Sequence, residues 1–134
     1  MSAICFTAVL DMGGNFGPFS EPRTVIFKKI LTNNENGYNQ QTGIFTAPEP
    51  GFYCFSFSYH ARQTQPSGLN LMKNNEVILK SFSERKMEGS FVDNASSTAC
   101  LQLNSGDTVY VSLPASYHVQ GTGDCTSFSG FLVK

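Results

Sequence analysis

The sequence predicts an all-β domain, and three observations carry that prediction. Short apolar segments recur along the whole chain, with Gly, Pro, Asn and Asp between them. Between residues 53 and 59 aromatic side chains alternate strictly with small ones, which is the period of a strand that has two unlike faces. No stretch sustains the 3.6-residue period of a helix. About ten strands without helices favour a closed barrel or a two-sheet sandwich, since these bury one face of every strand.

The first half of the chain contains four of the expected strands. They span residues 3–10, 24–31, 43–47 and 52–61. Gly13 and Gly14 end the first strand, and the run 33–37 forms a turn after the second because Asn and Gly tolerate left-handed backbone. Pro48 and Pro50 cannot donate to a neighbouring strand, so we expect them in the connection before the aromatic strand.

The second half contains five further expected strands. They span residues 69–73, 77–82, 98–103, 109–113 and 126–133. Asn74 and Asn75 separate the first two and form a good hairpin tip. Loops are expected over 84–90 and 114–123, and Asn104 to Asp107 forms a turn.

Composition limits the classes of partner. The 134 residues are expected to form one domain, 1–134, that can bury a sizeable core. Charged residues make up only 14% of the chain, against roughly 25% in a typical soluble domain, which suits an oligomer that hides part of its surface. A net charge of −1 gives no field that would attract nucleic acid or acidic lipid.

The sequence shows no signal for membrane insertion or zinc. No apolar run reaches the roughly 20 residues that cross a bilayer, and the N-terminus lacks a secretory leader pattern. We therefore expect a soluble fragment from which a signal peptide and any stalk are absent. The four cysteines have no CxxC spacing and do not cluster with the two histidines, so no zinc site is predicted.

Catalytic and modification signals are sparse. His60, at the end of the aromatic strand, and His118, in a late loop, are expected at the surface, and neither has a local catalytic signature, so we predict no enzyme. Asn94 begins an Asn-Ala-Ser sequon, which predicts an N-glycan on a surface loop if the chain is secreted.

Eight residues at fixed spacing resemble the signature of the complement C1q globular-head family. They are Phe27, Asn33, Tyr38, Phe45, Gly51, Tyr53, Phe55 and Phe57. Residues 6–8 and 128–133 are similar to the first and last strands of that family, so the resemblance covers nearly the whole chain. It implies an all-β jelly-roll sandwich of the C1q/tumour-necrosis-factor (TNF) type, with ten short strands in two sheets.

The alternation of apolar residues and the resemblance together give an expected core and an expected subunit interface. The core is Phe6, Phe27, Phe45, Tyr53, Phe55, Phe57, Leu101, Phe128 and Gly130. The resemblance implies a homotrimer around the sheet that holds the first strand, the last strand and the aromatic strand. The residues expected to face neighbouring subunits are Cys54, Ser56, Ser58 and Cys100. Small side chains there would permit close approach of the subunits.

We expect Cys54 and Cys100 on adjacent strands of one sheet, facing away from the core. They are then either a cross-strand disulfide or two neighbouring free thiols, and the sequence leaves both open. Cys5 and Cys125 fall near opposite ends of neighbouring strands in the resembling fold, so we do not expect them to pair.

Residues 93–96 resemble a loop that supplies a calcium ligand near the threefold axis in some relatives. This implies that Asp93 is a Ca²⁺ ligand, although one carboxylate per subunit fills only part of a shell of six to eight oxygens. A second polar position follows nine residues later in those relatives, and here it is the uncharged Gln102. The alternative is that Asp93 only caps a turn.

The resemblance implies a secreted, non-enzymatic recognition head that binds a protein, glycan or microbial surface in several copies at once. Two alternatives use the same fold: a secreted receptor ligand of the cerebellin or adipokine type, and a structural trimerisation domain of a collagen-like protein.

Overall fold

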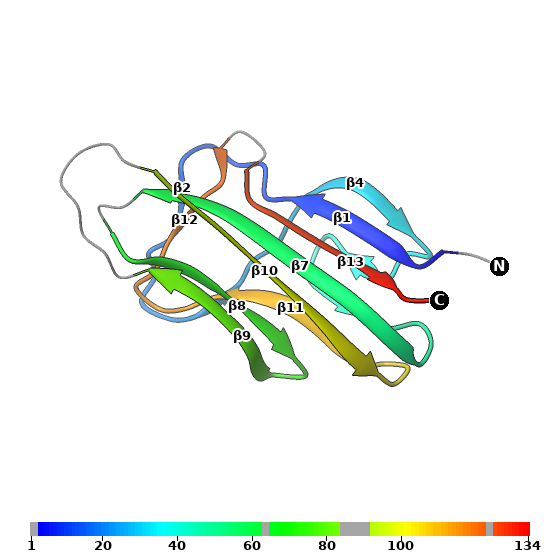
Figure 1. Cartoon of the computed structure of the whole chain (residues 1–134). Helices are drawn as coiled ribbons and strands as arrows, with labels where there is room; N and C mark the ends of the chain where they lie inside the picture. The colour runs from blue at the N-terminus through cyan, green and yellow to red at the C-terminus, as the bar shows by residue number, and fades with distance from the viewer. Residues whose placement is uncertain (1–2, 63–64, 84–91, 123–124) are drawn as a thin grey trace.

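The chain folds into two antiparallel β-sheets packed face to face, as shown in a computed structural model (Figure 1). The structure describes residues 3–62, 65–83, 92–122 and 125–134. Sheet A contains β1 (Cys5–Val9), β2 (Asn15–Phe16), β4 (Lys29–Asn34), β7 (Gly51–Arg62), β10 (Val92–Leu103), β12 (Val119–Gln120) and β13 (Ser127–Leu132). Sheet B contains β3 (Arg23–Thr24), β5 (Tyr38–Asn39), β6 (Ile44–Thr46), β8 (Ser67–Lys73), β9 (Glu76–Ser83) and β11 (Thr108–Leu113).

The long strand β7 is the centre of sheet A. One of its edges pairs with β10 over its full length, and the other pairs with β13 and, at His60, with β12. Strand β13 pairs in turn with β1, and β1 pairs with β4. In sheet B the order is β5, β6, β11, β8 and β9, with β3 also beside β11. The first strand (β1), the last strand (β13) and the aromatic strand (β7) therefore lie in the same sheet, as the family resemblance implied.

The all-β, two-sheet prediction is confirmed, with thirteen described strands in place of about ten. The difference comes partly from two-residue strands such as β2 and β12, which lie in segments expected to be loops. The strand expected over 24–31 is split, because β3 belongs to sheet B and β4 to sheet A. Between them Val25 and Phe27 are fully buried, so this segment closes the side of the sandwich while it changes sheets.

Two turns explain the asparagine-rich segments. The Asn74–Asn75 tip of the β8–β9 hairpin has φ values of 49° and 70°, as a two-residue hairpin turn requires. Strand β4 runs on to Asn34, so the expected turn over 33–37 is shorter, and Glu35 and Asn36 adopt the positive φ angles of 68° and 54°. Asn33 is instead a strand residue whose amide donates to the Tyr38 carbonyl oxygen over 2.7 Å.

The core between the sheets is aromatic. Seven of the residues expected there are buried side chains, each at most 2% exposed: Phe6, Phe27, Phe45, Tyr53, Phe55, Phe57 and Phe128. Gly130 is also buried, and an added Cβ would lie 2.5 Å from the Phe55 ring, which explains why this position has no side chain.

Leu101 is the one residue of the expected core that is not fully buried: it packs at the margin of the core. Its strand, β10, pairs with β7 alone among the described strands, so the inward face of β10 is incompletely covered.

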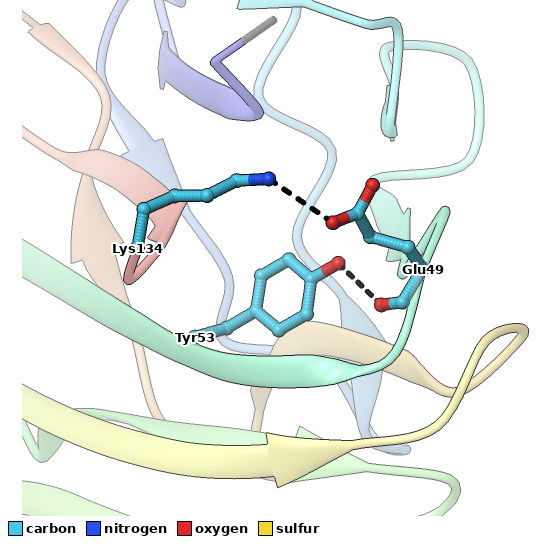
Figure 2. Close-up of polar contacts among 3 residues, drawn as sticks. All are labelled: Glu49, Tyr53 and Lys134. Atoms are coloured by element: carbon cyan, nitrogen blue, oxygen red, sulfur yellow. Dashed lines mark hydrogen bonds and ion pairs between the residues drawn. The ribbon is translucent and has the colours of Figure 1, made fainter. Parts of the chain in front are cut away.

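Two tyrosines of the signature use their hydroxyl groups to fix loops. The Tyr38 hydroxyl donates to the Phe27 carbonyl oxygen and accepts from the Phe27 N–H, both over 2.9 Å. The Tyr53 hydroxyl donates to the Glu49 carbonyl oxygen over 2.6 Å, beside an ion pair between Glu49 and Lys134 (Figure 2). Burial raises the pKa of both phenols, that of Tyr38 to about 12.

Candidate functional site

The face of sheet A that points away from the core is the first candidate site, and we call it the outer face of sheet A. Strand register places its side chains in rows, because directly paired residues point to the same side of a sheet. One row is Cys5, Phe131, Cys54 and Cys100; the next is Thr7, Ser129, Ser56 and Thr98; the third includes Ser127, Ser58 and Ser96. All four residues expected to face neighbouring subunits lie in these rows.

Four serines of these rows form two hydrogen-bonded pairs. The hydroxyl groups of Ser56 and Ser129 lie 3.1 Å apart, and those of Ser58 and Ser127 lie 3.0 Å apart. Removing water from a hydroxyl group that already has a protein partner costs less free energy than removing it from an unpaired one. Another protein surface could therefore cover the centre of this face at low cost in free energy.

Cys54 and Cys100 form a cross-strand disulfide on this face, with their Cα atoms 4.1 Å apart. Of the two possibilities that the sequence left open, the structure has the disulfide. Cys5 lies in the same row but on the far side of Phe131. Cys125 lies in the exposed segment just before β13, at the end of the sheet opposite to Cys5.

Three large apolar side chains are exposed at the end of this face near the chain termini. Phe52 is 57% exposed, Phe131 51% and Val133 48%. Val133 lies beside Phe52, since its N–H donates to the Phe52 carbonyl oxygen over 2.8 Å. Sequence reasoning did not single out these three residues, although the alternation over 126–133 would have turned Phe131 outward. Clustered apolar exposure of this kind marks a contact surface.

The part of this face that β7, β10 and β13 form also lacks charge. The outward positions of β7, β10 and β13 whose side chains are described carry no Lys, Arg, Asp or Glu. The cost of burying an uncompensated charge, several kcal/mol per ion, does not arise there. Small side chains, satisfied hydroxyl groups, apolar exposure and missing charge make this face suitable for contact with another protein surface.

The sequon lies in a strand and not in the expected loop. Asn94 is the third residue of β10, directly opposite His60, and its side-chain oxygen accepts a hydrogen bond from the His60 ring. The residue is exposed, on the outer face of sheet A. A glycan there would extend from the same face as the serine rows.

The Asp93 backbone lies in β10 opposite Ala61, so the residue belongs to a strand and not to the turn that the alternative assumed. The side chain of Asp93 lies outside the described residues. Gln102 is nine residues further along the same uninterrupted strand, which separates the two positions by about 30 Å at about 3.3 Å per residue. Asp93 and Gln102 of one subunit therefore cannot ligate the same Ca²⁺ ion.

The two histidines have structural hydrogen bonds. His118 is fully buried, contrary to the expectation of a surface loop residue, and its Nδ1 donates to the Pro66 carbonyl oxygen over 2.9 Å. Within the described residues, no group of three His, Cys, Asp or Glu side chains is placed to hold a metal ion. In the same residues no helix has the length and apolar character needed to cross a membrane.

Comparison with known proteins identifies the fold. The globular domain of a zebrafish complement 1qA protein superposes with a TM-score of 0.77 at 21% identity, covering 98% of each chain. Eiger TNF from S. frugiperda superposes with a TM-score of 0.73 at 13% identity, covering all of this chain and 94% of the other. The architecture is thus the jelly-roll sandwich of the C1q/TNF type.

The family follows from the sequence comparisons. A family model described as the C1q domain matches residues 5–133, so the chain belongs to the C1q domain family. The mouse collagen alpha-1(X) chain is 33% identical over 80% of this chain, and the hibernation-associated plasma protein HP-20 of Tamias sibiricus is 32% identical over 93%. This chain spans 16% and 61% of the lengths of those two relatives.

Proposed function

We propose that this chain is a secreted, non-enzymatic recognition domain that assembles as a homotrimer through the outer face of sheet A. The surfaces left outside the trimer would bind a protein, a glycan or a microbial surface. One observation carries the proposal: β7, β10 and β13 form a continuous surface with two pairs of mutually bonded serines, with exposed Phe52 and Phe131, and with no charge among its described outward side chains.

Membership of the C1q family supports the trimer, since C1q/TNF-type domains generally assemble in threes. It also supports the non-enzymatic role, because that family is generally without catalytic activity. One of the relatives is named a plasma protein, and this supports an extracellular location. Three copies of a weak site on one rigid trimer raise the overall affinity for a repetitive surface by orders of magnitude.

The trimer is tested with Ser56→Arg, which puts a guanidinium at the centre of the outer face of sheet A. Burial of one unpaired charge per subunit costs several kcal/mol, enough to dissociate the assembly. Light scattering should give three times the 14.7 kDa chain mass for the wild type and the single mass for the variant. Ser20→Arg, on an exposed loop, is the matched control and should stay trimeric.

A wild-type mass of one chain at micromolar concentration would refute the trimer, and a trimeric Ser56→Arg variant would refute the assigned face. Recognition is tested by a binding screen of the purified wild type against receptor ectodomains, glycans and fixed microbial cells. Binding to none of the three classes would contradict the recognition role.

A structural role is the second candidate, favoured by the similarity to a collagen chain. In that case the domain would set the register of three collagen-like stems and bind no external ligand. A trimer that is silent in the binding screen, yet accelerates triple-helix formation when fused to a Gly-Pro-Pro repeat, would favour this candidate.

A further inference from the structure

We infer that a shallow hollow on the outer face of sheet B binds a sugar ring that carries a carboxylate. The inference rests on the proposed recognition function and names a ligand class for it. The hollow has a volume of about 210 Å³ and is lined by Asn70, Lys80, Phe82, Pro114 and Tyr117. That volume is below the range of about 300–1,000 Å³ typical of drug-sized ligands, and it suits a single sugar unit.

The hollow lies on the side of the sandwich that the proposed trimer leaves open. Leu69 and Leu71 on β8 are fully buried in the core, so Asn70 between them points away from it. Register places Asn70 directly opposite Lys80 on β9, and Phe82 lies two residues further along β9 on the same side. Sheet B faces away from the outer face of sheet A, so three copies of the hollow would point outward from a trimer.

An aromatic pair forms one wall of the hollow. Phe82 is 50% exposed, and its ring meets the Tyr117 ring edge to face with centroids 5.8 Å apart. The residue opposite Phe82 is Gly68, where any Cβ would collide with Phe82, so no side chain covers the ring from that strand. The C–H groups of a sugar ring carry partial positive charge and pack well against the negative face of an aromatic ring.

The Asn70 side chain supplies an unused acceptor. Its Oδ1 atom is buried and has no hydrogen-bond partner among the described residues. A buried acceptor without a protein partner destabilises the fold unless a water molecule, an ion or a ligand bonds it. When the Asn70 side chain turns toward the hollow, a sugar hydroxyl group there can donate to this oxygen, and this gives the site a preference for polyols over purely apolar ligands.

Lys80 gives the hollow its charge preference. Its side chain is exposed, and no salt bridge to it occurs in the described part of the chain. An ammonium group at the rim attracts a carboxylate on the ligand, although solvent exposure keeps that attraction modest. The expected ligand is therefore an acidic sugar such as a hexuronate, and a neutral sugar should bind more weakly.

The test uses two probes that differ only at C6, methyl glucuronide and methyl glucoside, in saturation-transfer NMR titrations of the wild-type protein. Methyl glucuronide should bind with a Kd of about 10⁻³ M, as expected for so small a ligand, and the glucoside about fivefold more weakly. Lys80→Gln should equalise the two probes, whereas Lys28→Gln, at an exposed lysine outside the hollow, should leave the ratio unchanged.

Two further variants separate binding from folding. Phe82→Ala should abolish binding of both probes, and Val77→Ala, an exposed apolar position on the same strand, should not. Asn70→Leu should abolish binding and raise the melting temperature, because it removes the unpartnered buried acceptor.

Absence of binding by either probe well above millimolar concentration, or binding that survives both Phe82→Ala and Asn70→Leu, would overturn the inference. If the probes fail while the wild type still binds a target in the screen above, only the sugar site is wrong. If both experiments fail, the recognition function fails with it.

Discussion

Replacing Tyr38 with Phe tests whether the signature residues of this chain stabilise loops through buried polar contacts. The Tyr38 hydroxyl is bonded to both the N–H and the C=O of Phe27, and the Tyr38 side chain is 2% exposed. Its loss leaves two backbone groups without that partner, at about 1–3 kcal/mol each. We expect Tyr38→Phe to lower the free energy of unfolding by about 2–6 kcal/mol, a large part of the usual total of about 5–15 kcal/mol.

The same substitution should change the pH dependence of stability. Burial raises the pKa of Tyr38 to about 12 from 10.0, only partly offset by the hydrogen bond from Phe27. Above pH 10 the unfolded chain therefore loses this proton before the folded chain does. The stabilisation is fully present below pH 10 and is lost as the pH rises to about 12, which amounts to about 2–3 kcal/mol at 1.36 kcal/mol per pH unit.

Urea denaturation at fixed protein concentration, from pH 8 to the alkaline limit of the measurement, gives both quantities. Tyr110→Phe is the matched control, because the Tyr110 hydroxyl donates to the exposed Asn75 side chain over 2.7 Å, and this hydrogen bond should contribute about 0.5–1.5 kcal/mol. A loss below 1 kcal/mol in Tyr38→Phe, or an alkaline decline as steep as that of the wild type, would refute the reasoning.

Three further predictions concern sheet A. Opening the Cys54–Cys100 disulfide, which closes a loop of 46 residues, should destabilise the chain by about 4 kcal/mol in the chain-entropy model; a Cys54→Ala/Cys100→Ala double variant with unchanged thermal melting would contradict this. We also propose that Asp93 binds Ca²⁺ near the threefold axis with a Kd of roughly 10⁻⁴ to 10⁻³ M, so that calcium raises the melting temperature of the wild type but not of Asp93→Ala; equal responses would exclude it. Because Asn94 lies on the proposed trimer interface, we expect an N-glycan on Asn94 only in chains that have not assembled. Glycopeptide mass spectrometry of the trimer fraction tests this, and an occupied site in that fraction would contradict it.

Much of the fold follows from the sequence because its signals are local. The alternation from Tyr53 to Tyr59 determines which face of β7 is buried, and the Asn74–Asn75 pair determines the hairpin between β8 and β9. Turn formation and strand alternation depend on neighbouring residues only, so a single sequence contains enough information to predict them. The eight signature residues also identify the family from the sequence. In the structure they stabilise the core and its loops.

Tertiary structure decided which residues share a surface. Asn94 and Leu101 could not be placed correctly from the sequence, because their surroundings depend on β10 lying at the edge of sheet A. His118 is buried because its loop folds back onto Pro66, 52 residues earlier. The hollow beside Asn70 combines side chains from β8, β9 and the segment after β11, and the charge-free face combines β7, β10 and β13. Contacts between such distant segments are fixed by sheet order and by the packing of the sheets, and no local pattern in the chain encodes them.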